Sequence, residues 1–278
     1  MRDFYPPSHP VPLDQADGLR RLFAGRRTQL LPLAANPHVP FTGVVMDRLA
    51  AAMATQGRRV LVVDASATSP LPHELARVDL RACIENLSPG VCYLPARGLP
   101  LSYVDTRGSA SAFIDALQAA APEVDVMLLH CEAQDLARVL KRRAARPLLL
   151  GADHPESIKH AYASCKLLVQ RCGLMTFDLL LSASSRSPRA AAIAHSLGGC
   201  ADKFLGAVLR HSAVLDPAGE TGAALDPALA QLLAAQLDLD EAPAAPTPLP
   251  VPAAAFSPPP FWQRQTPNAD VFSDAFSD

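Results

Sequence analysis

Residues 28–64 constrain the fold more than any other stretch of this chain. An apolar run over 28–34 predicts a buried strand, a turn-rich loop follows over 35–42, and an alanine-rich pattern over 43–56 predicts a helix. A second apolar run, 60–64, predicts another strand that ends in the carboxylate of Asp64. These segments predict a βαβ unit, in which the loop after the first strand is where α/β proteins hold a phosphate.

The loop of that unit lacks most of the groups that bind phosphate. A phosphate loop needs glycines that let backbone N–H groups surround the ligand, a lysine, and a Ser or Thr hydroxyl for Mg²⁺. Here Thr42 supplies the hydroxyl, but Phe41 stands at the lysine position, and Pro37 and Pro40 remove two N–H donors. Taken alone, the loop favours an ordinary βα connection over a nucleotide loop that has lost its function.

The rest of the chain continues the alternation of strands and helices. The run over 124–131 is continuously apolar, as expected for a strand buried on both faces of a parallel sheet. Further strands are predicted over 90–95, 147–152, 177–181 and 204–215, and helical segments over 75–86, 109–121, 135–143, 157–172, 188–197 and 225–239. This order predicts an α/β domain over 28–239 with a doubly wound, mostly parallel sheet.

The N-terminal region is predicted to have two parts. Residues 1–12 include four prolines and are expected to be extended and flexible. Over 13–24, Asp14 is a good N-cap, and apolar side chains recur at helical spacing. Because such a short helix is marginal alone, it must pack either on its own domain or on a partner.

The C-terminal region changes composition abruptly. Residues 240–278 begin with an Ala/Pro run that cannot form a regular helix or strand ladder, and we expect them to be disordered. The sequence Phe-Ser-Asp occurs at 272–274 and again at 276–278. Most tails of this kind are simply solvated, although the duplication is also compatible with a short linear motif.

Composition limits the classes of partner and compartment. The formal net charge of −2 gives no global argument for binding nucleic acid or a membrane. Six scattered cysteines without a C-x-x-C pair indicate reduced thiols. No segment is apolar over the roughly 20 residues that a membrane span needs, so we expect a cytoplasmic protein without a stable membrane anchor.

Four stretches together resemble the MinD/ParA-type (SIMIBI) P-loop ATPases, and within them the FlhG-like regulators of flagellar number. The first, 14–22, is similar to the D-Q-A-x-x-L-R element of that subfamily. The others are the βαβ unit ending at 57–64, the D-H-P-E-S-I-K-H-A-Y stretch at 153–162, and A-D-K-F-L at 201–205. The resemblance spans about residues 13–217 and implies the same α/β fold.

The departures from this family concentrate at its nucleotide site. Both lysines of its phosphate loop are missing, Asp64 is kept but the carboxylate after it is Ser66, and the Asp that ends the later buried strand is His130. The resemblance therefore favours a decayed nucleotide pocket. Its expected residues are Asn36, Phe41, Thr42, Asp64, Ser66, His130, Asp153, Pro155 and Ser182. Losing charge, backbone donors and metal support together leaves no residues for the electrostatics of phosphoryl transfer.

The resemblance implies a non-catalytic regulator of flagellar biosynthesis that acts by protein–protein binding, with no cofactor and no metal. In the family, the N-terminal element acts on FlhF, an SRP-type GTPase, and relatives also contact flagellar switch components and a transcriptional activator. The expected partner-binding residues are Asp14, Gln15, Ala16, Leu19, Arg20, Leu22 and Phe23.

Two other functions stay open. One is a residual ATPase that binds ATP or ADP with Mg²⁺ weakly and dimerises with nucleotide, and the other is an α/β enzyme that uses the emptied pocket for another ligand. Further candidate chemistry is sparse. His130, Cys131 and Glu132 are consecutive, so they cannot all converge on one ligand, and His130 is expected to be a core histidine.

Overall fold

The computed structural model describes residues 28–219 and 225–237, all of which lie in one compact unit. The eight strands form one sheet in the order β3-β4-β2-β5-β1-β6-β7-β8. Every neighbouring pair is parallel except β3 and β4. The strands are β1 (Gln29–Ala34), β2 (Val60–Asp64), β3 (Glu85–Ser88), β4 (Val91–Pro95), β5 (Val126–Cys131), β6 (Leu148–Ala152), β7 (Thr176–Ser182) and β8 (Val208–Leu215). The predicted fold class is confirmed.

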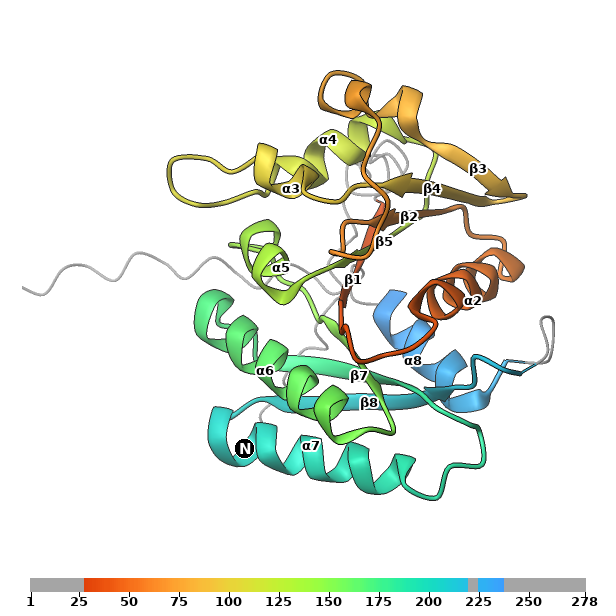
Figure 1. Cartoon of the computed structure of the whole chain (residues 1–278), viewed down its shortest axis with the longest axis vertical. Coiled ribbons are helices and arrows are strands. Elements are labelled where there is room, and N and C mark those ends of the chain that lie inside the picture. The colour runs from red at the N-terminus through yellow and green to blue at the C-terminus, as the bar shows by residue number, and fades with distance from the viewer. Residues whose placement is uncertain (1–27, 220–224, 238–278) are drawn as a thin grey trace, which may run out of the picture. The chain divides into compact units, whose positions relative to one another are not determined.

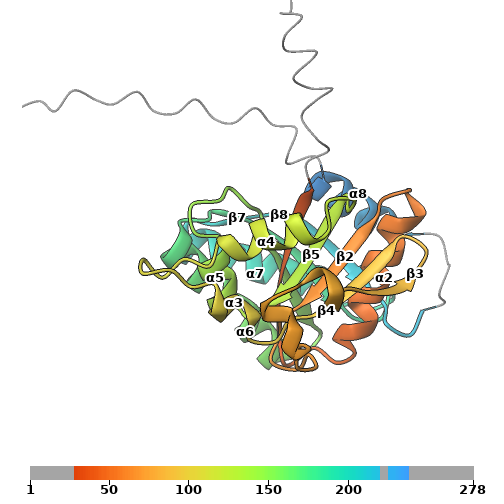
Figure 2. The ribbon, with the colours of Figure 1, turned by 90° about the horizontal axis from the view of Figure 1, so that it is seen from above.

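Helices cover both faces of the sheet (Figures 1 and 2). One face packs on α2 (Thr42–Thr55) and α8 (Pro227–Leu237). The other face packs on α3 (Leu99–Ser102), α4 (Ala112–Ala120), α5 (Ala133–Val139), α6 (Pro155–Cys172) and α7 (Ala190–Leu205). Among the described helices, none is both long enough and apolar enough to cross a membrane.

The first βαβ unit forms as the sequence predicts. Val45, Leu49 and Met53 recur every four residues on the buried side of α2, so one stripe of that helix packs on the sheet. The helix ends at Thr55, and Gly57 follows with a φ of 76°. Glycine adopts this left-handed conformation without the steric cost that other residues incur, so the chain can turn sharply into β2.

Three segments differ from the sequence-based expectation. The helix expected over 75–86 is instead two short 3₁₀ helices, Glu74–Arg77 and Arg81–Cys83, followed by β3. All four β3 residues are exposed and pair only with β4, so no apolar pattern marks this strand. The helix expected to end at 197 continues to Leu205, and β8 begins at Val208 rather than at 204. Gly206, with a φ of 65°, ends that helix.

A buried polar cluster fixes the C-terminal end of α8. Gln236 Nε2 donates to Asp178 Oδ2 at 2.7 Å and to the Arg146 carbonyl at 3.0 Å. Arg146 Nε lies 2.9 Å from the same Asp178 oxygen, and its guanidinium also donates to the carbonyl of Ala235. On the sheet side, the backbone N–H of His211 donates to Asp178 Oδ1 at 3.0 Å. The cluster therefore joins α8 to β7 and β8.

The predicted segments 1–12, 13–24 and 240–278 lie entirely outside the described residues, and the helix expected over 225–239 is described as far as Leu237. All six cysteines are described, and none forms a disulfide.

Candidate functional site

The loop between β1 and α2 is held in place by one buried side chain. Asn36 Nδ2 donates to the carbonyls of Leu150 at 2.8 Å and Ser157 at 2.9 Å, which belong to β6 and α6. Its Oδ1 accepts the backbone N–H of His38 at 3.1 Å. Asn36 thus ties the loop to two other elements and to itself. The sequence named Asn36 but not its contact with Ser157, because 121 residues separate the two.

Most of the polar groups of this loop bond within the chain. Pro37 and Pro40 have no N–H, the N–H of His38 is bonded to Asn36, and the N–H of Val39 donates to the Asn36 carbonyl at 3.1 Å. The Thr42 hydroxyl donates to the Val39 carbonyl at 3.0 Å. A phosphate loop instead turns its N–H groups toward the ligand, and this loop does not have that arrangement.

Phe41 adopts a strained backbone conformation at the start of α2. Its φ of 57° and ψ of 34° are left-handed, and its side chain makes no capping hydrogen bond. For a residue with a Cβ this conformation costs about 1–2 kcal/mol. The residue is 70% exposed, so its ring does not fill the pocket in place of a phosphate.

Asp64 and His130 form a buried pair at the ends of β2 and β5. They are direct neighbours in the parallel register, and His130 Nδ1 lies 2.8 Å from Asp64 Oδ1. The N–H of Ser66 donates to the same oxygen at 3.2 Å. Burial raises the pKa of Asp64, but the hydrogen bond and charge of His130, with the Ser66 bonds, outweigh it and hold this pKa below 3.8.

The other nitrogen of this histidine has no bonding partner. His130 is only 2% exposed, and its Nε2 finds no hydrogen-bond acceptor or donor among the described residues. The side chain of His130 is buried, as expected for a core histidine. Only its Nδ1 is hydrogen-bonded within the described part of the chain, to Asp64. Cys131 and Glu132 do not join the pair, because Cys131 lies in the core on the opposite face of the sheet and Glu132 is the N-cap residue before α5.

The remaining expected pocket residues lie on other strand ends. Ser182 ends β7, and its buried hydroxyl has no partner among the described residues. Asp153 Oδ2 accepts the Ser187 hydroxyl at 3.0 Å, and Pro155 is the first residue of α6. Of the expected pocket residues, the structure thus brings Asp64, Ser66 and His130 into contact with one another. Asn36 and Asp153 form their side-chain hydrogen bonds with residues outside the expected set.

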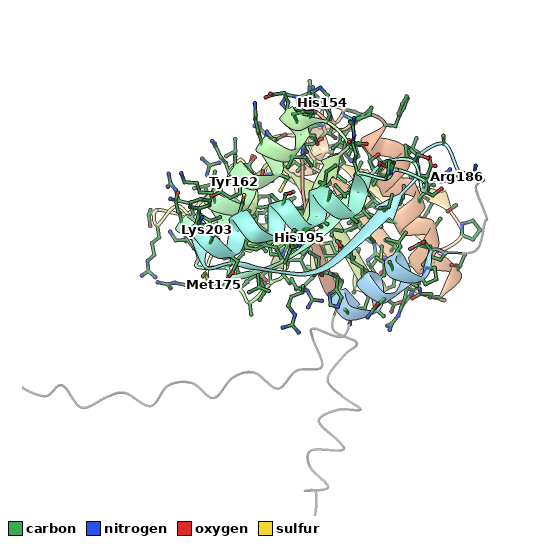
Figure 3. The ribbon with its side chains drawn as sticks, turned by 90° about the horizontal axis from the view of Figure 1, so that it is seen from below. His154, Tyr162, Met175, Arg186, His195 and Lys203 are labelled. Carbon is green, nitrogen blue, oxygen red and sulfur yellow. The ribbon has the colours of Figure 1, made fainter. Side chains whose placement is uncertain are left out.

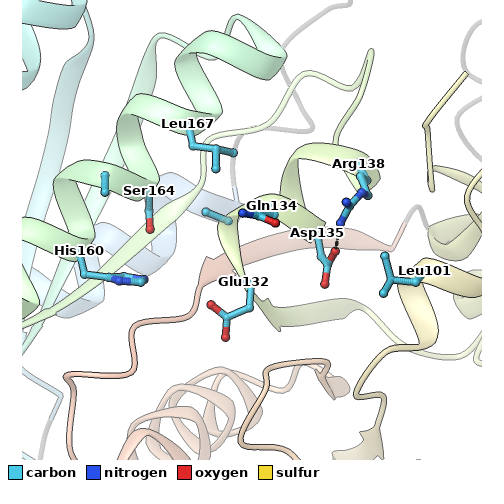
Figure 4. A pocket seen from close by; sticks show the side chains of 10 residues that line it. Leu101, Glu132, Gln134, Asp135, Arg138, His160, Ser164 and Leu167 are labelled. Atoms are coloured by element: carbon cyan, nitrogen blue, oxygen red, sulfur yellow. Dashed lines mark hydrogen bonds and ion pairs between the residues drawn. The ribbon is translucent and has the colours of Figure 1, made fainter.

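A hollow of about 550 Å³ lies beside this edge of the sheet, between α5, α6 and α3 (Figure 4). Glu132 and His160 face it from two elements, and Asp135 pairs with Arg138 at 2.5 Å on its rim. The sequence analysis missed this hollow, because its residues come from segments that show no shared motif. Within the described residues, no group of three or more His, Cys, Asp or Glu side chains could hold a metal ion.

The partner-binding residues expected over 13–24 lie outside the described residues, so their role stays a prediction. They are Asp14, Gln15, Ala16, Leu19, Arg20, Leu22 and Phe23.

No protein-family model and no curated protein matches this chain in sequence. Several solved structures share its fold. Cobyrinic acid a,c-diamide synthase of Mycobacterium smegmatis, solved with bound ADP and magnesium, is similar over 78% of this chain and 96% of its own, with 18% identity and a TM-score of 0.53.

A second solved structure has a comparable likeness. A putative plasmid partition protein of Borrelia burgdorferi, solved with AMPPNP, is similar over 78% of this chain and 100% of its own, with 10% identity and a TM-score of 0.52. A ParA family ATPase of Chlorobium tepidum covers 79% of this chain at 17% identity with a TM-score of 0.44. At these identities the first two show a common fold, so function has to be argued from the site.

Proposed function

We propose that this chain is a non-catalytic, FlhG-like regulator of flagellar biosynthesis that acts by binding protein partners. The observation that carries the proposal is the internal bonding of the β1–α2 loop. Asn36 takes the His38 and Val39 N–H groups, and the Thr42 hydroxyl bonds to Val39. The fold implies ATP and Mg²⁺, but the residues at this loop do not fit them.

The charges around the loop support the same proposal. Residues 36–42 include no lysine or arginine, so nothing in the loop compensates the charge of a polyphosphate. The one carboxylate kept from the family pattern, Asp64, is already bonded to His130 and to the Ser66 N–H. Charges that are taken out of water without compensation cost several kcal/mol, so nucleotide has no favourable place here.

The principal partner in this proposal is an FlhF-type SRP GTPase, which would bind the predicted helix over 13–24. Support comes from the D-Q-A-x-x-L-R-like residues at 14–20 and from the apolar spacing around Leu19. Flagellar switch components and a flagellar transcriptional activator are further partners by the same resemblance. The sheet would serve as a scaffold for these contacts.

Specific observations keep the two alternatives in view. Thr42 and Asp64 remain in place, as a residual ATP-binding protein would require. The buried Nε2 of His130 would suit an enzyme that recognises another ligand. The ATP-binding alternative needs the loop to release contacts that it makes in this structure.

Nucleotide binding can be tested by calorimetry on the full chain. We expect no binding heat when ATP with Mg²⁺ is titrated up to millimolar concentration, because residues 36–42 include no lysine or arginine and the His38 and Val39 N–H groups are already bonded within the loop. Micromolar affinity would overturn the non-catalytic assignment and favour the residual ATPase. Asn36→Ala provides a control, because it frees the His38 N–H without adding a lysine or arginine to the loop.

Partner binding can be tested by deleting residues 1–24. We expect the shortened chain to keep its far-UV circular dichroism and to lose capture of an FlhF-type GTPase. Leu19→Asp should also abolish capture, because it puts a charge into the apolar contact, whereas Arg20→Ala should weaken it in a salt-dependent way. If the deletion binds as well as the full chain, the role assigned to 13–24 is wrong.

A further inference from the structure

The first strand and the last helix of the described domain meet at their outer ends. β1 begins at Gln29 and α8 ends at Leu237, and the side-chain amide of Gln29 donates to the Leu237 carbonyl over a separation of 208 residues. Figure 2 shows α8 beside β1. The sequence that precedes β1 and the sequence that follows α8 therefore join the domain at neighbouring points.

The C-terminal end of α8 concentrates negative charge. The aligned peptide dipoles of a helix give this end roughly half a negative charge, so cations stabilise it and anions do not. The last turn of α8 has no basic residue, and the sequence continues with the acidic run Asp238, Asp240 and Glu241. Arg146 donates to one carbonyl of this end, but its charge is compensated by the buried Asp178. A further cation here would stabilise both the helix and the acidic run.

The segment that precedes β1 carries the opposite charge. Residues 20–27, the basic run, contain four arginines and no acidic residue. Arg27 stands two positions before Gln29, and Asp238 directly follows Leu237. The hydrogen bond between Gln29 and Leu237 thus sets the basic run and the acidic run within a few residues of each other. The acidic run contains all the acidic residues of 238–269, so it is the nearest source of negative charge after α8.

The end of α8 is firmly attached to the domain. Gln236 Nε2 is bonded to Asp178 at 2.7 Å and to the Arg146 carbonyl at 3.0 Å. The leucines of the helix share an apolar cluster with Ala213 and Leu215 of β8, and Figure 3 shows the helix alongside that strand. Because both attachment points are fixed and close, each charged run is present near the other at a high effective concentration, on the order of millimolar.

We propose that the arginines of the basic run pair with the acidic run at the C-terminal end of α8. A single exposed ion pair contributes little to stability, whereas several charges held close together form a network that contributes more. The contact occupies Arg20, which the proposed function assigns to the partner, so it competes with partner binding by 13–24. Only this competition rests on the proposed function, since the pairing follows from the two charged runs and their attachment points.

Protease protection of the full chain measures the pairing. Chymotrypsin cleaves after Phe23, which lies between the arginines, and the isolated peptide 1–28 gives the cleavage rate of an unpaired segment. At low ionic strength we expect the full chain to be cleaved at least about threefold more slowly than the peptide, because cleavage tracks the unpaired fraction. In about 1 M NaCl the two rates should converge, since screening then acts within about 3 Å.

Charge variants separate this pairing from other causes of protection. Neutralising the acidic run with Asp238→Asn, Asp240→Asn and Glu241→Gln should raise cleavage to the peptide rate. The matched control neutralises three aspartates further along the chain and should leave the protection unchanged; they are Asp270, Asp274 and Asp278. Glu123→Gln, which removes an exposed carboxylate near the start of β1, should also leave it unchanged. Exchanging the charges, with glutamates in the basic run and lysines in the acidic run, should restore protection relative to the corresponding peptide.

The melting temperature gives an independent measurement whose sign is decisive. In a chain whose four arginines at 20–27 are replaced by glutamine, the acidic run only opposes the dipole of α8, so neutralising it should raise the melting temperature. In the natural chain the same neutralisation should lower the melting temperature, because the pairing is lost. An increase in both chains would overturn the pairing.

Two cleavage results would also overturn the pairing. Protection that survives both high salt and neutralisation of the acidic run would show that 13–24 packs on the domain through its apolar side chains. Protection that is lost in Glu123→Gln would place the arginines against the edge of the sheet instead of against α8.

The competition is tested by capture of the GTPase proposed above. The chain with the neutralised acidic run should bind it at least about threefold more tightly than the natural chain at low ionic strength, because the same unpaired fraction limits cleavage and binding. Equal affinity would overturn the competition. Failure of every chain to bind the GTPase would remove the competition together with the proposed function, whereas the pairing is judged by cleavage and melting alone.

Discussion

At the scale of single residues, the Asp64–His130 pair shows how the ends of two central strands are stabilised. Asp64 is buried with two donors on one oxygen, the His130 ring and the Ser66 N–H. Removing one member of a buried pair leaves the other charged or polar group without compensation, which usually costs about 3–5 kcal/mol. Replacing both members by apolar groups costs much less.

A double-mutant cycle tests this. We expect His130→Leu to lower the free energy of unfolding at neutral pH by about 3 kcal/mol, because it leaves the Asp64 carboxylate buried with only the Ser66 N–H. The double variant Asp64→Leu/His130→Leu should recover most of that loss. Urea unfolding followed by circular dichroism gives the four values. A double variant as unstable as His130→Leu would show that the pair is not the cause.

The acid limb of stability gives a second measurement on Asp64. Its pKa is lower in the folded chain than its ordinary value of 3.8, so the unfolded chain binds a proton more readily. Its contribution is therefore fully present above that value and is lost as pH falls through the folded pKa. We expect the unfolding free energy of Asp64→Asn to fall less steeply below pH 4 than that of the natural chain. Parallel curves would contradict the pairing.

At the scale of elements, the apolar runs predicted the strands that lie inside the sheet. The runs that became β1, β2, β5, β6 and β7 are mostly apolar because helices cover both faces of the sheet. β3 was missed because its exposed residues carry no such run and it forms only by pairing with β4. The boundary between α7 and β8 was misplaced because A-D-K-F-L at 201–205 was not recognised as the end of a helix. The helix continues through these residues and ends at Leu205, where Gly206 follows in the left-handed conformation.

The attachment of α8 could not be predicted from sequence, because it joins residues far apart along the chain. Gln236 and Arg146 meet over a separation of 90 residues, and both contact Asp178. The same limit applies to the candidate site. Sequence placed Asp64 and His130 at strand ends, but their pairing depends on β2 and β5 being neighbours, which the local pattern does not reveal.

The Gln236 contact gives a prediction for α8. Gln236→Ala should lower the free energy of unfolding by about 1–3 kcal/mol, because it removes one donor from the buried Asp178 carboxylate. Hydrogen exchange should become faster in α8 before it does in β5, since the helix loses its anchor while the strand keeps its neighbours. Gln134→Ala, on the rim of the hollow beside α5, is a control. Uniformly faster exchange would indicate that α8 has no separate attachment.

At the scale of the whole molecule, α8 closes one face of the sheet together with α2. Its Leu229, Leu232, Leu233 and Leu237 are buried with α2 in one apolar cluster. Fully burying a leucine stabilises by about 1.5–3 kcal/mol relative to leaving it exposed, so four of them amount to a large part of a typical domain's net stability. The residues that follow α8 have a composition that predicts no packing.

Two truncations separate these contributions. A chain that ends at residue 241 should keep the melting temperature of the full chain within about a degree, because the Ala/Pro-rich residues beyond it cannot offset their ordering entropy. A chain that ends at residue 225 should unfold at a much lower temperature and bind a hydrophobic dye, because the α8 side of the sheet is then exposed to water. Differential scanning calorimetry measures both melting temperatures.

If the chain ending at 241 melts several degrees lower, the predicted disordered tail, with its Phe261 and Trp262, packs on the domain. If the chain ending at 225 melts normally, the α2 face is stable without α8 and the cluster around Asp178 contributes little.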